Sequence, residues 1–402
     1  MGDTQKHTKP NVPNLRFPGF EGDWEQHLLS EYLDFKNGLN PSAKSFGEGI
    51  KFISVMDILN NPFITYDCIR ASVNATEKEK QEFNVEYGDI LFQRSSETLE
   101  DVGHANVYLD SRTALFGGFT IRGKKKGAYN PLFFKYLLDS PTARKKVIVK
   151  GAGAQHFNIG QEGLSKVVLS FPSIQEQNRI AVFMNLLDQR IAIQNKVIKD
   201  LIHIKESTTK KLLKTHDIPG RVVTLGEITE VITRRNKQRI VFPMYSVTND
   251  RGFIPQSEQF EDREMVGEDI AAYKIIHNGE IAYNPARINV GSIAQYTEES
   301  PCMISSLYVC IKARPGVLGN WLIQVLRSEQ LINYYNLYAE GGVRLYLFYP
   351  NFAKIKVFLP SIEWQKKVAN ALETMEAKIK LESSLLASYQ HAKEAILSKM
   401  FV

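Results

Sequence analysis

The sequence predicts an α+β protein made of two tandem mixed α/β domains. Each domain is followed by a long helix, and the two helices pair as an antiparallel coiled coil. Three observations predict this fold: the 402-residue chain repeats itself, each repeat ends in a long Pro- and Gly-free tail, and the remainder alternates short β-rich runs with turn residues. Two such units most simply form a pseudo-two-fold object.

The repeat is clearest at the ends of the two copies. The segment that starts at Phe171 aligns without a gap to the segment that starts at Leu359, at a shift of 188 residues. Gln177 meets Gln365 in this alignment, and upstream Gly153 meets Gly341. A period this long is a duplicated domain with its helix, because solenoid repeats recur every ~20–50 residues.

The domain boundaries follow from the repeat and from the turn signals. Within the copies, β-rich runs at residues 51–56, 89–92 and 116–121 are separated by Gly, Pro and Asn, and helical stretches follow at residues 131–138 and 321–326. The expected segments are an N-terminal extension (1–21), a first domain (22–171), a first helix (172–214), a second domain (215–359) and a second helix (360–402).

Each tail begins with Pro-Ser, which is a helix-start signal, and carries apolar residues at alternating spacings of four and three. This spacing is typical of a coiled-coil seam, and the other copy is the obvious partner. The expected seam residues are Phe183, Leu187, Ile191, Gln194, Ile198, Leu372, Met375, Ile379, Glu382 and Leu386.

Two of these seam positions are polar, and they match each other in the repeat. Gln194 and Glu382 are related by the same shift of 188. A polar residue in a seam often fixes register and partner orientation. The alternative is that the helices tilt and both side chains reach water, and the sequence leaves the two interpretations open.

Basic and amide side chains gather in candidate loops of both copies. The net charge of +6 permits a nucleic-acid partner without requiring one, but Arg94 and Arg287 follow the matched turns Gly88-Asp89-Ile90 and Gly279-Glu280-Ile281. Arg, Lys, Asn and Gln are the side chains that read base edges and bind phosphates. The candidate DNA-binding residues are Arg94, Ser95, Ser96, Lys124, Lys125, Lys126, Gln155, His156, Arg234, Arg235, Asn236, Lys237, Arg287, Asn289, Arg344 and Tyr346.

No catalytic or metal motif stands out. The sequence has no convincing cofactor loop, no phosphate-binding loop and no histidine pair at metal-ligand spacing. Its three cysteines (Cys68, Cys302 and Cys310) form no Cys-x-x-Cys pair, which favours a reducing cytoplasm. The chain contains no run of ~18 apolar residues and begins with a polar stretch, so neither a membrane span nor a signal peptide is expected.

The duplicated plan and its motifs resemble the specificity (S) subunits of type I restriction–modification systems. The resemblance covers nearly the whole chain. It rests on the two matched turns, on the opening Leu15-Arg16-Phe17-Pro18-Gly19-Phe20, and on the helix starts Pro172-Ser173-Ile174-Gln175-Glu176-Gln177 and Pro360-Ser361-Ile362-Glu363-Trp364-Gln365. Trp364 is a departure, since such tails usually carry Glu at this place.

The resemblance implies a non-catalytic protein. Each divergent domain would be a target recognition domain that reads one half of a bipartite duplex DNA site. The paired helices would set the half-site spacing and dock two methyltransferase subunits. The chain itself would bind no cofactor or metal. S-adenosylmethionine, ATP and Mg²⁺ would be used by the methyltransferase and motor–nuclease subunits, and the location would be cytoplasmic.

Two other classes of function stay open on the residues alone. One is a nuclease or methyltransferase with its own recognition domains, against which the missing catalytic motifs count. The other is a coiled-coil scaffold that binds only protein, which would show no salt-dependent binding to DNA.

Overall fold

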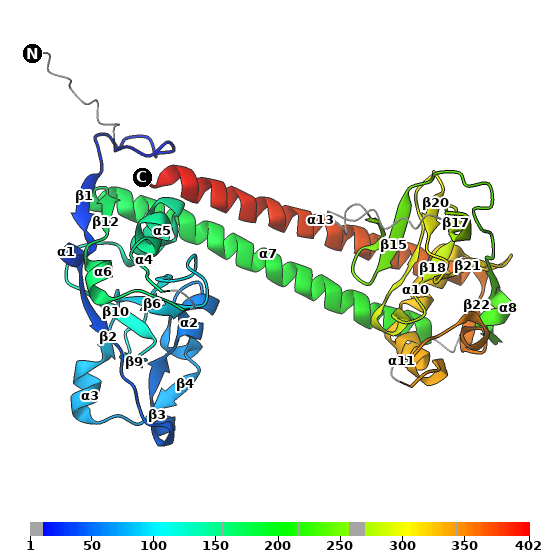
Figure 1. Cartoon of the computed structure of the whole chain (residues 1–402), viewed down its shortest axis with the longest axis horizontal. Coiled ribbons are helices and arrows are strands. Elements are labelled where there is room, and N and C mark those ends of the chain that lie inside the picture. The colour runs from blue at the N-terminus through cyan, green and yellow to red at the C-terminus, as the bar shows by residue number, and fades with distance from the viewer. Residues whose placement is uncertain (1–10, 154–155, 215–217, 257–269, 343) are drawn as a thin grey trace, which may run out of the picture. The chain divides into compact units, whose positions relative to one another are not determined.

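The computed structural model describes residues 11–153, 156–214, 218–256, 270–342 and 344–402. The chain divides into two compact units. Unit 1 comprises residues 1–196 and 384–402, and unit 2 comprises residues 197–383. Each unit therefore combines one α/β domain with parts of both long helices, α7 (Ile174–Lys214) and α13 (Ile362–Met400) (Figure 1).

Unit 1 contains two four-stranded sheets. The first has the order β2-β10-β6-β8, and the second has the order β4-β3-β9-β5. The strands of the first are β2 (Leu33–Asn37), β10 (Thr120–Lys125), β6 (Ile90–Gln93) and β8 (Ala105–Val107). Those of the second are β4 (Ala71–Val73), β3 (Phe46–Ile53), β9 (Ala114–Phe116) and β5 (Asn84–Val85). All pairs are antiparallel except β3 with β9.

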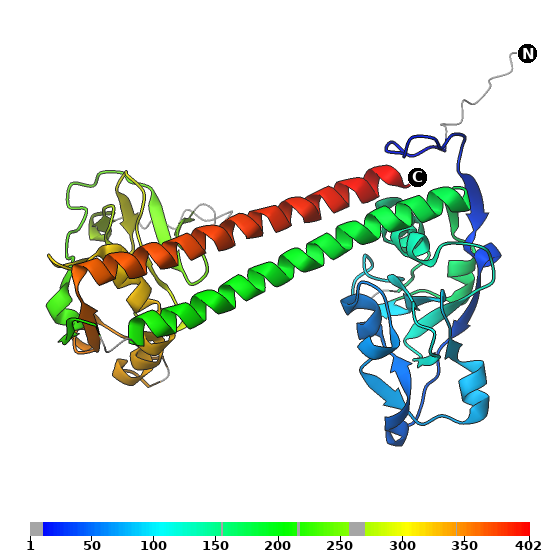
Figure 2. The same cartoon turned by 180° about the vertical axis from the view of Figure 1, so that it is seen from behind.

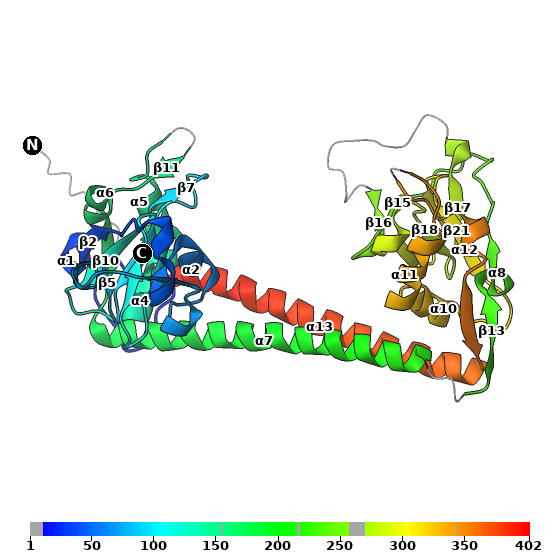
Figure 3. The same cartoon turned by 90° about the horizontal axis from the view of Figure 1, so that it is seen from below.

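Short helices and two-stranded ribbons complete unit 1. The ribbons are β1 (Glu25–Leu28) with β12 (Val168–Phe171), and β7 (Ser95–Ser96) with β11 (Phe157–Asn158). The helices are α1 (Leu29–Tyr32), α2 (Val55–Asn60), α3 (Glu77–Glu82), α4 (Pro131–Asp139), α5 (Pro141–Ile148) and α6 (Gln161–Ser165). The β7–β11 ribbon lies on the side of unit 1 away from α7 (Figure 3).

Unit 2 repeats this plan. Its sheets have the orders β14-β21-β18-β19 and β16-β15-β20-β17, and β15 with β20 is again the parallel pair. The strands are β14 (Thr229–Val231), β21 (Val309–Ala313), β18 (Ile281–Tyr283), β19 (Ile293–Gln295), β16 (Gly252–Pro255), β15 (Met244–Thr248), β20 (Cys302–Ile304) and β17 (Lys274–Ile276). Strands β13 (Gly220–Thr224) and β22 (Lys356–Pro360) correspond to the β1–β12 ribbon.

Short helices complete unit 2. They are α8 (Leu225–Ile228), α10 (Gly319–Leu326), α11 (Glu329–Tyr338) and α12 (Tyr349–Phe352). Helices α10 and α11 lie between the strands and the long helices (Figure 3), and Lys210 of α7 forms an ion pair with Glu329 of α11. The matched strand orders confirm that the mixed α/β fold is present twice.

The same joint attaches each domain to its long helix. Helices α7 and α13 begin directly after Pro-Ser, as predicted. The buried Gln177 accepts a hydrogen bond from Asn130 N (3.0 Å) and donates one to Pro172 O (3.0 Å). Gln365 makes the equivalent bonds with Leu318 N (2.9 Å) and Pro360 O (3.0 Å). The glutamine that the repeat matches is therefore a structural connector in both copies.

The two long helices pair antiparallel within each unit, which confirms the predicted orientation. Figures 1 and 2 show α7 and α13 running in opposite directions. In unit 1, Lys393 pairs with Asp188 (2.6 Å), and Arg190 donates to the Tyr389 hydroxyl (3.2 Å). In unit 2, Lys205 pairs with Glu376 (2.5 Å). The two ion pairs occupy equivalent places, since Lys205 and Lys393, like Asp188 and Glu376, differ by 188.

The predicted seam residues are buried to different degrees. Leu372 is fully buried and Gln194 is 5% exposed, so the polar residue at this position does turn inward. Half-buried positions are Leu187, Ile191, Ile198, Met375, Ile379, Glu382 and Leu386. Phe183 instead packs edge-on against Phe17 (5.6 Å between ring centroids) and remains 37% exposed, because the N-terminal segment lies against this side of α7.

The last turn of α13 belongs to the core of unit 1. Met400 and Phe401 are buried, and the Phe401 ring lies 6.2 Å from Trp24 and 5.8 Å from Phe133, measured between centroids. Leu15 N donates to Lys399 O (2.9 Å). Residues from both ends of the described chain thus complete one core.

One predicted strand is two strands. The run at residues 116–121 ends β9 and starts β10, and the chain turns between them. A Cβ on Gly118 would lie 1.9 Å from Asn40 Oδ1, so only glycine fits this close approach. The turn carries the chain from the second sheet to the first.

Candidate nucleic-acid interface

The clearest candidate interface in unit 2 is formed by two segments that are far apart in the sequence. Asn284, Arg287 and Asn289 follow strand β18, and they line a cavity of about 610 Å³ together with Arg344 and Leu345. Leu347 N donates to Pro285 O (2.9 Å), which holds the later segment against the earlier one. The sequence-predicted residues Arg287, Asn289 and Arg344 therefore meet at one surface.

A glycine shapes the later segment. Gly341 has a φ of +135°, and a Cβ there would lie 2.0 Å from Arg344 O. A backbone bridge joins Glu340 to Tyr346. Tyr346 stacks on Phe348 with ring centroids 5.8 Å apart, so it shapes the base of the loop that carries Arg344.

Unit 1 repeats the arrangement with different side chains. Gly153 has a φ of +149°, a Cβ there would lie 2.0 Å from His156 O, and a bridge joins Ala152 to Asn158. Ile159 N donates to Arg94 O (2.9 Å), as Leu347 N does to Pro285 O. The β7–β11 ribbon pairs Ser95 with Asn158 and Ser96 with Phe157, so Arg94–Ser96 and the exposed His156 belong to one surface. Gln155 lies outside the described residues.

The matched turns before β6 and β18 position these loops. Gly88 and Gly279 adopt φ of +92° and +84°, which favour glycine. Asp89 accepts hydrogen bonds from Glu86 N (3.0 Å) and Lys125 N (2.9 Å), and Glu280 accepts one from His277 N (2.8 Å). Burial raises the pKa of Asp89. The carboxylate of each turn, Asp89 or Glu280, thus has a structural role, because it binds backbone N–H groups of the turn.

Arg287 and Arg344 differ from the arginines that are bound to carboxylates. In the described part of the chain, Arg287 and Arg344 are exposed and form no ion pair, whereas Arg16 is bound to Glu176 (2.8 Å) and Arg234 to Glu280 (2.7 Å). An arginine without a carboxylate partner keeps its donors available for phosphates or base edges.

Other predicted residues lie elsewhere in the domains. The register pairs Thr120 with Gln93 and Gly123 with Ile90, so Lys124–Lys126 lie toward the opposite end of β6 from Arg94. Lys124 and Lys126 pair with Glu86 (3.5 Å) and Asp34 (2.9 Å), and the Lys125 ammonium lies 4.8 Å from the Tyr129 ring centroid. These lysines do not share a surface with Arg94.

The predicted cluster from Arg234 to Lys237 is split between surface and interior. Asn236 is fully buried and donates to Ile240 O (2.7 Å), so its side chain is structural and does not face a ligand. Arg234 also donates to Ile275 O (3.0 Å). Arg235 and Lys237 are exposed. A run of polar residues in the sequence does not reveal that the Asn236 side chain points into the interior.

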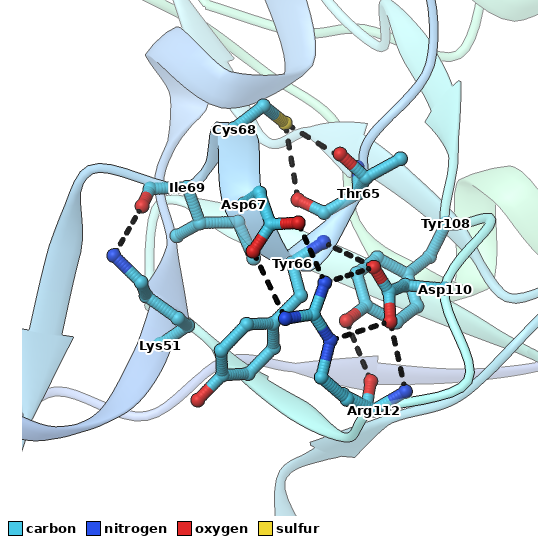
Figure 4. Close-up of polar contacts among 9 residues, drawn as sticks. All are labelled: Lys51, Thr65, Tyr66, Asp67, Cys68, Ile69, Tyr108, Asp110 and Arg112. Atoms are coloured by element: carbon cyan, nitrogen blue, oxygen red, sulfur yellow. Dashed lines mark hydrogen bonds and ion pairs between the residues drawn. The ribbon is translucent and has the colours of Figure 1, made fainter.

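A further arginine cluster in unit 1 was not predicted. Arg112 makes two bonds to Asp67 (2.9 Å each) and pairs with Asp110 (2.9 Å), and its guanidinium lies 4.5 Å from the Tyr66 ring centroid (Figure 4). Hydrogen bonds from Arg112 lower the pKa of both carboxyl groups. With two carboxylates around one guanidinium, the cluster joins two loops and offers no net positive charge.

Two residues that line the interface of unit 2, Asn284 and Arg251, are not among the predicted ones. Asn284 lines the first cavity and, with Arg251 and Tyr308, a second cavity of about 470 Å³ that Arg287 also borders. Asn284 lies three residues before Arg287 at the end of β18, and this proximity was a usable signal. The contribution of Arg251 depends on tertiary packing and left no local pattern.

Within the described ranges, no three His, Cys, Asp or Glu side chains are arranged to hold a metal ion. None of the helices described is both long and apolar enough to cross a membrane. Burial raises the pKa of the Cys302 and Cys310 thiols to about 12, which makes them poor nucleophiles.

Comparisons with known proteins define the class. Residues 21–203 match the family described as the type I restriction modification DNA specificity domain. Along almost its whole length the chain is 22% identical to the protein named as the MjaX type I restriction enzyme specificity subunit of Methanocaldococcus jannaschii, covering 98% of this chain and 96% of that one.

Solved structures share the fold. The S subunit of a type I restriction–modification system from M. genitalium has a TM-score of 0.59 at 15% identity and covers 97% of this chain and 99% of its own. The HsdS subunit from Thermoanaerobacter tengcongensis has a TM-score of 0.50 at 16% identity, with coverages of 96% and 98%. Residues 21–203 thus match a type I restriction modification DNA specificity domain, and the chain as a whole is similar to specificity subunits of type I restriction–modification systems.

Proposed function

We propose that each α/β domain of this specificity subunit reads one half of a bipartite duplex DNA target. The observation that carries this proposal is the convergence of the exposed Arg287 and Arg344 with the half-buried Asn289 around one cavity. Exposed arginine side chains suit base edges in the major groove and the phosphates beside it.

The repeat supports the bipartite part of the proposal. Both units place a bridged segment against the loop that follows the matched turn, yet the side chains differ, with Ser95 and His156 in one and Asn289 and Arg344 in the other. The same scaffold with different contact groups would read two half-sites of different sequence.

The long helices offer a surface for partner proteins. On α7 of unit 1, the exposed apolar residues Val182, Leu186 and Ile193 recur on one helix face, beside the seam that contacts α13. Leu381, the counterpart of Ile193, is also exposed. We assign this apolar surface to two methyltransferase subunits, and we assign to the paired helices the role of setting the half-site spacing.

The chemistry belongs to the partner subunits in this proposal. Methyltransferase subunits would use S-adenosylmethionine to methylate adenine at N6, and motor–nuclease subunits would use ATP and Mg²⁺. This chain would bind neither a cofactor nor a metal and would act in the cytoplasm.

The deciding experiment measures methylation in cells. The chain is co-expressed with the adenine methyltransferase encoded beside its gene, and N6-methyladenine is mapped by single-molecule sequencing. We expect a bipartite methylated motif with a fixed gap that appears only when this chain is present. Arg287→Ala and Arg344→Ala should relax or abolish recognition of one half-site.

Arg221→Ala is the control in unit 2, because Arg221 is also exposed but lies on β13 and pairs with Glu227 (3.5 Å). It should leave the motif unchanged. Methylation that does not depend on this chain would contradict the specificity role. Identical motifs in the wild type and in both cavity variants would contradict the assigned interface.

A further inference from the structure

We infer that Phe119 and Leu307 insert as apolar wedges between base pairs, one in each half-site of the target. The inference rests on the proposed function and adds a contact of a different chemical kind to it. The two residues lie in the turns that join the two sheets of each unit, β9 to β10 and β20 to β21.

The first support is their exposure at equivalent positions. Phe119 is 72% exposed and Leu307 is 77% exposed. They differ by 188 residues, the shift that relates the two copies. A single exposed apolar side chain needs no explanation. Two exposed apolar side chains at the same position of otherwise divergent domains indicate that both domains use this side chain for the same purpose.

The second support is the rigidity of the turns. Around Phe119, Thr120 N and Thr120 Oγ1 both donate to Gly117 O (2.9 and 2.7 Å), and Gly118 packs against Asn40 with no room for a side chain. Around Leu307, Tyr308 N donates to Ser305 O (3.1 Å) and Lys274 Nζ to Tyr308 O (2.6 Å). The apolar side chains therefore project from fixed backbones.

The third support is their position beside the candidate interface. Arg94 N donates to Phe119 O (3.0 Å), and the Arg94 guanidinium approaches Gly118 O (3.4 Å). In unit 2, Tyr308 lines the same cavity as Arg287. Phe119 is thus bonded through its backbone to Arg94, and Leu307 directly precedes a residue that lines the cavity of Arg287.

DNA is the partner that this combination fits. Phe and Leu are among the side chains that proteins insert between base steps, where the cost of unstacking is offset by new contacts. A neighbouring arginine can hold the phosphate beside the opened step. The two turns would open one step in each half-site and favour flexible pyrimidine–purine steps.

The test uses the full chain in complex with its methyltransferase partner and duplexes that carry the mapped target. 2-Aminopurine is placed at successive positions of each half-site, away from the methylated adenine. Wild type should raise the fluorescence at one step of each half-site. Phe119→Ala should abolish that rise in one half-site, Leu307→Ala in the other, and each should weaken specific binding about ten- to a hundred-fold.

Matched variants distinguish the loss of an inserted side chain from a loss of folded structure. Phe119→Leu, which copies the residue of the other unit, should keep both the fluorescence rise and the affinity. Tyr87→Ala and Val222→Ala remove side chains that are 58% and 65% exposed, on the turn before β6 and on β13 respectively, and should bind like wild type. Unfolding midpoints of all variants should coincide.

The outcomes are distinguishable. If wild type shows no salt-dependent preference for the target, the proposed function fails and the inference fails with it. If wild type shows the preference and both alanine variants match it in affinity and fluorescence, only the inference is overturned. Loss of the methyltransferase from Phe119→Ala during gel filtration would also overturn it, since the turn would then contact protein.

Discussion

Asp89 is a buried carboxylate whose charge is held by backbone amides. It is 1% exposed and accepts hydrogen bonds from two N–H groups, yet burial raises its pKa. Desolvation therefore outweighs the hydrogen bonds. The turn that places Arg94 depends on this one side chain.

Asp89→Asn tests that dependence. An amide has one acceptor oxygen, so one of the two N–H groups would lose its partner at a cost of about 1–3 kcal/mol. Removal of the charge relieves the desolvation of the carboxylate, so unit 1 should be destabilised by less than this cost. Hydrogen exchange in increasing urea, read on peptides of unit 1, measures the loss. A wild-type exchange profile would show that the carboxylate does not hold the turn.

The same variant has a defined pH dependence. A raised pKa means that the folded state binds the proton more tightly, so this group adds stability as the pH falls toward the raised pKa. Asn cannot titrate. The difference in unfolding free energy between wild type and Asp89→Asn should therefore widen as the pH is lowered from 7, and a constant difference would contradict the assignment.

Sequence reasoning succeeded for single residues where the repeat marked them, and failed where tertiary packing decided. Gly153, Gly341 and the two glutamines were matched by the shift of 188, and each has the same structural role in both copies. Asn236 was misjudged because the burial of a polar side chain leaves no local signal.

Helix α13 carries both buried and exposed leucines. Leu372 is fully buried, whereas Leu381 on the same helix is 63% exposed. Leu372→Ala should destabilise unit 2 by about 2–5 kcal/mol through cavity formation, while Leu381→Ala should change it by less than about 0.5 kcal/mol. Thermal unfolding of the two variants gives the comparison, and equal effects would contradict the assigned core.

The glutamine joint predicts equal effects in the two copies. Gln177→Leu and Gln365→Leu would each leave a buried amide N–H and a carbonyl without a partner, at a cost of about 1–3 kcal/mol per group. Gln175→Leu, at an exposed position of α7, is the control. Hydrogen exchange at Asn130 and Leu318 would rise in the respective variant, and unchanged exchange would show that the joint is held by other contacts.

Periodicity was a good guide to these helices and a poor guide to their neighbours. The spacing of four and three predicted the pairing and its polar position, because a seam has a regular repeat. It could not show that Phe17 would cover Phe183, since that contact joins segments far apart in the chain. The strand predicted at residues 116–121 failed because two apolar runs flank a sharp glycine turn.

At the scale of the whole molecule, the duplication predicts that a mutation in one domain changes the recognition of one half-site and leaves the other unchanged. Removing one phosphate-binding arginine should lower the salt slope of binding by about 1. Arg287→Ala should do so while weakening discrimination in one half-site only. Competition with duplexes scrambled in either half measures this, and a loss shared equally by both halves would argue against independent readers.

The burial of Met400 and Phe401 against Trp24 has a consequence for how the protein is made. The core of unit 1 receives its last side chains only after the entire second copy has been synthesised. At ~5–20 residues per second, the 187 residues of unit 2 take roughly ten to forty seconds. Unit 2 contains no residue after 383, so all of its residues have been synthesised before the last residues of unit 1. Trp24 of the first copy therefore stays without its contact to Phe401 until the end of α13 has been made.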